Sequence, residues 1–78
     1  MNVDIKVQFG NRLREIRTQK NISQERLAEL AGLDRTYVSK IERGQRNISL
    51  EVAARLARAL DIDIRGFFTK INEDQRTY

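Results

Sequence analysis

Apolar residues recur at intervals of three and four along most of the chain, which is the period of a helix with one side facing a core. Two early stretches follow this spacing: Phe9, Leu13, Ile16 and Leu27, Leu30, Ala31. Alternation of apolar and polar residues, the pattern of a strand, is not dominant. The pattern therefore predicts an all-α fold.

Capping residues divide this pattern into five predicted helices. A side-chain oxygen placed just before a helix accepts a hydrogen bond from a free backbone N–H of its first turn. Candidates for this role precede the four later helices: Ser23, Asp34, Ser49 and Asp63. The predicted helices cover residues 5–20, 24–31, 35–44, 50–60 and a short segment that carries Ile64, Phe67, Phe68 and Ile71.

The first predicted helix contains Gly10, which costs about 1 kcal/mol in a helix interior, so we expect its firm part to begin near Phe9. The chain has no proline and no linker-like stretch. We therefore expect one domain, residues 1–71, followed by a flexible tail, residues 72–78.

The second and third predicted helices are separated by a very short turn. Two helices joined so closely need a small residue where their backbones meet, and Ala28 supplies it; Gly32 can adopt the positive φ of the turn. Val38 and Ile41 are expected on the inner side of the third helix. Their predicted partners are three leucines: Leu27, Leu30 and Leu33. This layout predicts a helix-turn-helix, whose second helix enters the DNA major groove.

The charge distribution favours a polyanionic partner. Fifteen Lys and Arg stand against eleven Asp and Glu, for a net charge of +4, and the basic excess lies in residues 6–20 and 34–46. Such basic segments are typical of nucleic-acid binding, although a charged stretch can also be a solvated helix face.

Composition disfavours an enzyme. The chain has no cysteine and no histidine, which removes thiol chemistry and the commonest general base and metal ligand. Asp61 and Asp63 are interpreted as capping residues rather than metal ligands. We expect no catalytic residue, no metal, no cofactor and no small-molecule effector.

The chain also lacks the features of a membrane or exported protein. No apolar stretch approaches the roughly 20 residues that span a bilayer. The N-terminal residues have neither the basic nor the apolar region of a secretory signal. We expect a cytoplasmic protein with no membrane partner.

The stretch ISQERLAELAGLDRTYVSKIERGQRNISLEVAARLARAL resembles the five-helix Xre/Cro-type repressor domain, a lambda-repressor-like fold, over about residues 9–68. Within that family, the Asp34-Arg35-Thr36-Tyr37 segment and the Arg46-Asn47 loop are similar to those of the controller proteins of restriction-modification systems. This resemblance implies a small homodimer that binds pseudo-palindromic operators beside its own promoter. It also implies control of its own gene and of the endonuclease gene.

Three residues on the outer side of the third helix are predicted to contact bases: Arg35, Thr36 and Lys40. The planar guanidinium of Arg35 can pair with guanine O6 and N7, a contact worth about 1–3 kcal/mol of discrimination; a phosphate contact or a surface ion pair is the alternative. For Thr36 and Lys40 the alternative is a phosphate contact. Seven residues are predicted to contact the DNA backbone: Arg17, Gln24, Tyr37, Ser39, Arg43, Arg46 and Asn47. For Tyr37 the alternative is packing, for Asn47 a turn, and for Arg17 an exposed basic face.

The last two predicted helices carry more apolar positions than one buried face requires, which predicts a dimer interface. Its predicted residues are Leu56, Leu60, Ile62, Ile64, Phe67 and Phe68. The alternative is that these residues close a single small core.

The sequence therefore predicts a sequence-specific DNA-binding transcriptional regulator that acts as a homodimer on double-stranded DNA. Two alternatives of the same fold remain open, an antitoxin-like or adaptor module that binds a protein, and a phage-type or chromosomal repressor. An enzyme is disfavoured by the composition.

Overall fold

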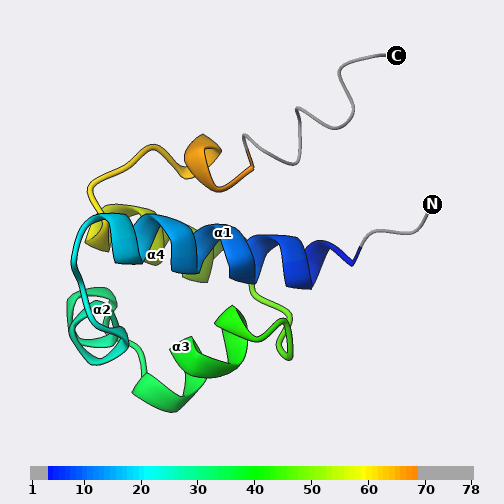
Figure 1. Ribbon diagram of the computed structural model, residues 1–78, viewed down its shortest axis with the longest axis horizontal. Helices are drawn as coiled ribbons and strands as arrows, with labels where there is room; N and C mark the ends of the chain where they lie inside the picture. Colours follow the sequence, from blue (N-terminus) through cyan, green and yellow to red (C-terminus); the bar gives the residue numbers. More distant parts are fainter. Residues whose placement is uncertain (1–3, 69–78) are drawn as a thin grey trace.

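The computed structural model describes residues 4–68, which form four α-helices and one 3₁₀ turn (Figure 1). The elements are α1 (Ile5–Gln19), α2 (Gln24–Ala31), α3 (Arg35–Glu42), α4 (Leu50–Ala59) and η1 (Ile64–Phe67). No strand occurs in this range, so the predicted all-helical class is confirmed for it. The predicted tail, residues 72–78, and Ile71 lie outside the described residues.

The predicted fifth helix is corrected to η1, a 3₁₀ turn of four residues. Its hydrogen bonds join residues three apart, from Gly66 N–H to the Asp63 carbonyl and from Phe68 N–H to the Arg65 carbonyl. Gly66 lies inside this short segment, where its low helix propensity disfavours a longer α-helix. The described residues therefore contain four α-helices, not five.

The helix starts agree with the predicted caps. Ser23, Asp34, Ser49 and Asp63 each accept a hydrogen bond from a backbone N–H of the following turn. The donors are Arg26, Thr36, Val52 and Arg65. The Arg65 side chain also hydrogen-bonds the Asp63 carboxylate and lowers its pKa below the ordinary value for aspartate. Asp63 is thus a capping residue, as the sequence predicted.

Each α-helix is followed by a residue in the left-handed conformation. These residues are Asn21 (φ 59°), Gly32 (φ 70°), Gly44 (φ 73°) and Asp61 (φ 56°). The N–H of the next residue donates in each case to a carbonyl five positions earlier. The four bonds are Ile22 to Arg17, Leu33 to Ala28, Gln45 to Lys40 and Ile62 to Ala57. They satisfy carbonyls that the helix leaves free and turn the chain sharply at each end.

The predicted weak point at Gly10 does not exist, because α1 is continuous through this residue. A Cβ atom at Gly10 would collide with the Ile41 carbonyl oxygen and would lie 2.8 Å from that of Glu42. Glycine therefore allows the backbone of α1 to touch the C-terminal end of α3.

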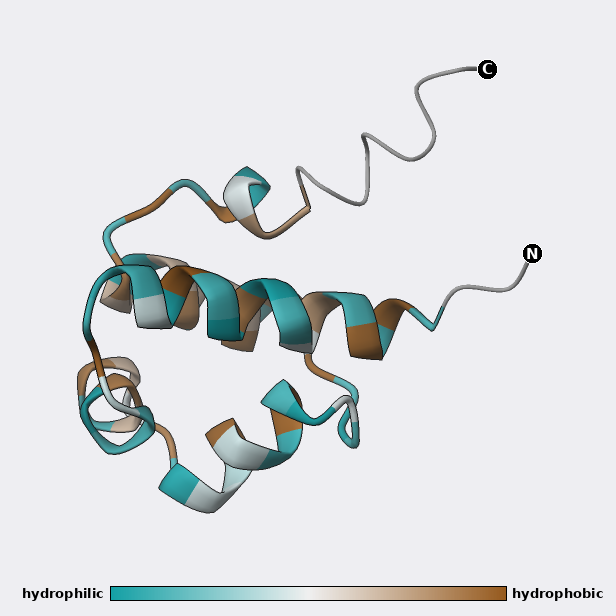
Figure 2. Ribbon diagram, in the orientation of Figure 1, coloured by the Kyte–Doolittle hydropathy of each residue, from teal (hydrophilic) through white to brown (hydrophobic). Residues whose placement is uncertain are grey.

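A single core lies between the helices, and Figure 2 shows apolar residues on their inner sides. Phe9 of α1 packs on Phe67 of η1, with ring centroids 4.9 Å apart. The Arg12 side chain also ties α1 to η1, because its Nε donates to the Gly66 carbonyl at 2.9 Å. One predicted core residue is not buried, since Leu30 is 46% exposed.

The core corrects half of the predicted dimer interface. Leu56, Leu60 and Phe67 are almost completely buried within the single chain, so they cannot contact a second copy without unfolding. Ile62, Ile64 and Phe68 are only partly buried and pack against the core from outside. The fold of η1 over α4 accounts for most of the apolar surplus that the sequence showed.

We expect Gly10→Ala to lower the free energy of unfolding by about 1–3 kcal/mol, because the added methyl group would collide with two backbone carbonyls of α3. Denaturant unfolding followed by circular dichroism measures this change. Gly66→Ala is the matched control, since its Cβ would meet only Ile62 Cδ1 at 3.5 Å, an ordinary contact. Equal stability of the two variants would contradict the proposed close approach.

Candidate nucleic-acid interface

The helix-turn-helix consists of α2, the turn at Gly32 and α3. Val38 and Ile41 are buried on the inner side of α3, as predicted from their spacing, and Ala28 is buried at the crossing. The opposite side of α3 leaves Arg35 and Thr36 exposed. The sequence thus builds a short helix with one side fixed in the core and the other open to solvent.

Two shallow depressions flank Thr36 on the outer side of α3. One is lined by Gln24, Arg35, Thr36 and Ser39. The other is lined by Asp34, Thr36, Tyr37, Lys40 and Arg46. The structure therefore brings together the three predicted base-contacting residues and four of the seven predicted backbone-contacting residues.

Tyr37 and Arg46 form one edge of this surface. Tyr37 is partly buried and packs against the core, while the Arg46 guanidinium carbon lies 4.9 Å from the centroid of its ring. This cation–π contact holds a loop arginine close to α3. The packing role and the interface position of Tyr37 are therefore compatible.

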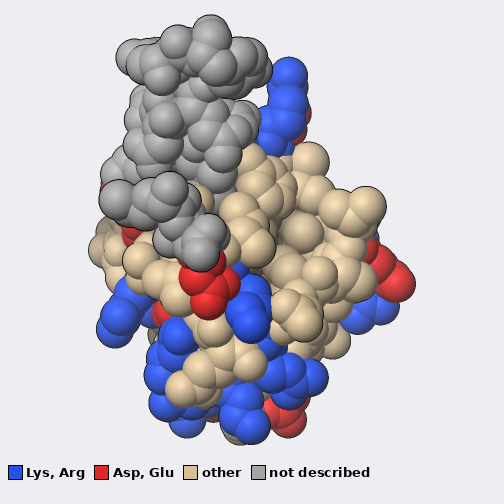
Figure 3. All heavy atoms as spheres, turned by 90° about the vertical axis from the view of Figure 1, so that its right-hand side faces the viewer, with Lys and Arg blue, Asp and Glu red and all other residues tan. Residues whose placement is uncertain are grey.

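Arg43 and Asn47 lie further along the chain. Arg43 is the exposed C-cap of α3, and Asn47 is exposed in the loop before α4. Figure 3 looks onto the end of the molecule where α1 begins and this loop lies; Lys and Arg gather at the bottom of the view, the level of α3 in Figure 1. On this face of the molecule, the basic side chains therefore lie at the level of α3.

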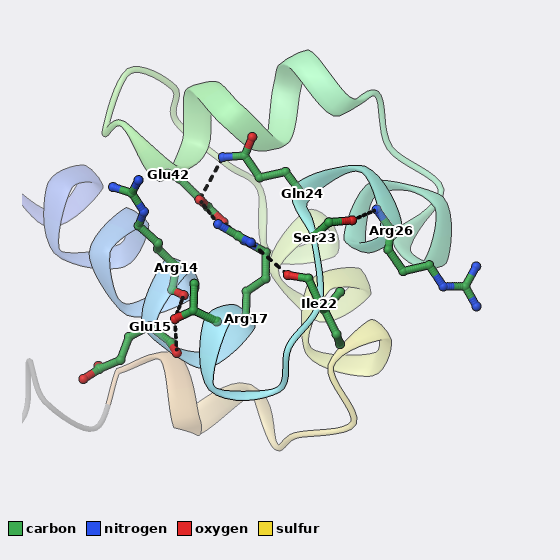
Figure 4. A network of polar contacts seen from close by, with 9 residues as sticks. Arg14, Glu15, Arg17, Ile22, Ser23, Gln24, Arg26 and Glu42 are labelled. Carbon is green, nitrogen blue, oxygen red and sulfur yellow. Dashed lines mark hydrogen bonds and ion pairs between the residues drawn. The ribbon is translucent and has the colours of Figure 1, made fainter.

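Arg17, which the sequence predicted to contact the DNA backbone, instead forms a buried ion pair with Glu42 (Figure 4). Its Nε and Nη2 donate to the two carboxylate oxygens of Glu42 at 2.6 and 3.0 Å, and its Nη1 donates to the Ile22 carbonyl at 2.8 Å. The Arg17 side chain is 11% exposed and that of Glu42 2%. Each of the three guanidinium nitrogens donates a hydrogen bond inside the protein, so Arg17 is held in the fold rather than extended toward a phosphate.

Glu42 is a residue that the sequence reasoning missed. It is the one buried charged residue in the range 4–68, and it also accepts a 3.0 Å hydrogen bond from Nε2 of Gln24. The spacing of residues along α3 could have revealed it, because Glu42 follows the buried Val38 by four positions and so lies on the same side of the helix. A carboxylate on the core side of a helix needs a buried partner.

The described residues contain neither a cluster of metal ligands nor a membrane-spanning helix. No group of three or more Cys, His, Asp or Glu side chains within residues 4–68 is arranged to hold a metal ion. None of the helices in that range is long and apolar enough to cross a membrane.

Comparisons with known proteins agree with the helix-turn-helix fold. A family model described as Helix-turn-helix matches residues 13–67. The control protein C.MunI of Mycoplasma sp is 42% identical over 72 residues, which cover 91% of this chain and 97% of that protein.

Two solved structures extend the comparison. The restriction-modification controller protein C.AhdI from Aeromonas hydrophila is similar, with 57% identity, a TM-score of 0.82 and coverage of 85% of this chain and 100% of that one. The controller protein C.Esp1396I, solved as a tetramer in complex with its natural 35-base-pair operator, has 29% identity and a TM-score of 0.82. That similarity covers 92% of this chain and 95% of the other.

We expect Arg17→Ala to destabilise the fold by about 3–5 kcal/mol, because it leaves the buried Glu42 carboxylate without its counter-charge. Arg26→Ala is the control; its pair with Glu29 is exposed, so its loss should cost less than about 1 kcal/mol. Urea unfolding at neutral pH measures both. A stable Arg17→Ala protein with weakened DNA binding would restore the phosphate contact predicted from the sequence.

Proposed function

This chain belongs to the helix-turn-helix family, and on that premise we propose that it is a sequence-specific DNA-binding transcriptional regulator of the controller type. It acts as a homodimer on pseudo-palindromic operators in double-stranded DNA. It controls its own gene and a restriction-modification operon, and it works in the cytoplasm as a binding protein without catalytic activity.

The observation that carries this proposal is the outer side of α3, where two depressions share Thr36 and collect the predicted contact residues. Arg35 stands at the N-terminal end of α3, the part of a recognition helix that reaches furthest toward base edges. Thr36 and Lys40 follow on the same side and complete the predicted base contacts.

The DNA backbone is contacted by residues on both sides of the recognition helix α3. Gln24 contributes from the first turn of α2, and Ser39 and Arg43 contribute from α3 itself. Arg46, held beside Tyr37, contributes from the loop together with Asn47. Contacts of this kind position the protein, while the base contacts supply specificity.

The dimer surface lies at the end of the molecule where α1 and α4 begin. A hollow of about 340 Å³ there is lined mainly by apolar side chains, among them Ile5, Phe9, Ile48, Leu50 and Phe68. Leu50 is 81% exposed and Ile5 is 52% exposed, so within residues 4–68 this apolar surface is left open to solvent. A second copy that packs here buries it, and Phe68 is the one member of the predicted interface that lines the hollow.

Two arginine variants test the DNA-binding proposal on a duplex that the unsubstituted protein selects from a random-sequence pool. Arg35→Ala should cost about 1–3 kcal/mol on that duplex and relax the preference at one base pair. Arg43→Ala should weaken selected and random duplexes about equally and reduce the salt slope by about one. Fluorescence anisotropy over a series of salt concentrations measures both effects. Failure to enrich any duplex would contradict the proposal as a whole.

Leu50→Glu should dissociate the dimer and leave the fold intact, because it places a charge on an apolar surface without entering the core. Leu30→Glu is the matched control, since Leu30 is an exposed leucine on α2 that does not line the hollow. Sedimentation at tens of micromolar measures the dimer and circular dichroism the fold. A dimer that survives Leu50→Glu would place the interface elsewhere.

A further inference from the structure

We propose that Glu42 is a positioning residue for DNA binding, because it holds the side-chain amide of Gln24 in one orientation at the edge of α3. This inference rests on the function proposed above. It assigns to the buried ion pair a part in recognition in addition to its part in the fold.

Chemistry fixes the orientation of the Gln24 amide. A carboxylate only accepts hydrogen bonds, so the 3.0 Å contact between Gln24 and Glu42 must involve the amide nitrogen. Figure 4 shows the amide oxygen directed away from Glu42. The nitrogen keeps one further N–H, which can donate a hydrogen bond to a phosphate oxygen.

Glu42 is itself held in place. Arg17 binds both of its carboxylate oxygens from the last turn of α1, and the same guanidinium binds the Ile22 carbonyl in the loop that leads to Gln24. The charge of Arg17 also compensates that of Glu42, which would otherwise repel a phosphate near Gln24. The three side chains form one connected network between α1, α2 and α3.

The location of Gln24 connects this network to the DNA-binding surface. Gln24 lines the same depression as Arg35, Thr36 and Ser39, so its amide lies where the DNA backbone would pass beside the recognition helix. A glutamine side chain that is free in solution loses rotamer freedom when it binds, at a cost to affinity. A glutamine already held by Glu42 does not bear most of that cost.

The test replaces the ion pair by apolar residues, since Arg17→Met with Glu42→Leu removes no net charge and avoids an unpaired buried ion. The probe is the duplex selected by the unsubstituted protein, and folding of each variant is checked by circular dichroism. We expect the pair replacement to weaken binding about two- to tenfold in the presence of Gln24. In the Gln24→Ala background it should cause no further loss.

Two results would overturn the proposal. One is an equal loss in both backgrounds, which would show that the pair acts on the fold or that Arg17 touches DNA itself; in the latter case the salt slope would fall as well. Another is unchanged affinity in a folded pair replacement. If no duplex is bound at all, the proposed function fails, whereas the amide spectrum of the free protein still tests the contact between Gln24 and Glu42.

A second measurement needs no variant of the ion pair. In the nuclear magnetic resonance spectrum of the unsubstituted protein, the Gln24 side-chain amide is assigned by its absence from Gln24→Ala. The two protons of a free glutamine amide already differ in shift, so the expected sign of the contact is a downfield displacement of the proton bonded to Glu42. A pair of signals at the positions of a free glutamine amide would remove the basis of the proposal.

Discussion

The contact between α1 and the end of α3 is the constraint on which the DNA-binding surface depends. The two helices approach so closely at Gly10 that no side chain fits between their backbones. Further along α1, Arg17 forms an ion pair with Glu42, the last residue of α3. These attachments set both the distance and the rotation of α3, and therefore decide which of its residues face outward. The outer residues can vary for different DNA sequences while the attachment stays the same.

Local signals in the sequence were sufficient for most of the fold. The four capping residues, the left-handed Gly32 and the inner positions of Val38 and Ile41 each depend on neighbours only a few residues away. The candidate site followed from these elements, because a helix-turn-helix with a known inner side has a known outer side. Arg35, Thr36 and Lys40 could be selected in this way without knowledge of the remaining helices.

Features that depend on distant residues were not predictable from the sequence. Arg17 and Glu42 are 25 positions apart, and each reads as an ordinary surface charge until the packing of α1 on α3 brings them together. The surplus of apolar residues in α4 predicted a dimer interface, whereas η1 folds back and buries Leu56, Leu60 and Phe67 within one chain. Gly10 was predicted to weaken α1, because the sequence does not show that two carbonyl groups of α3 leave no room for a side chain at this position.

The length of the recognition helix has a consequence for the protein in the cell. Both α2 and α3 contain eight residues, which is below the roughly 12–15 that an isolated helix needs to persist in water. The DNA-reading element therefore exists only while the whole domain is folded. The concentration of active regulator follows the folding equilibrium of the entire chain. A change in the stability of the domain therefore changes the amount of protein that can bind DNA. A substitution far from the DNA can alter transcription in this way.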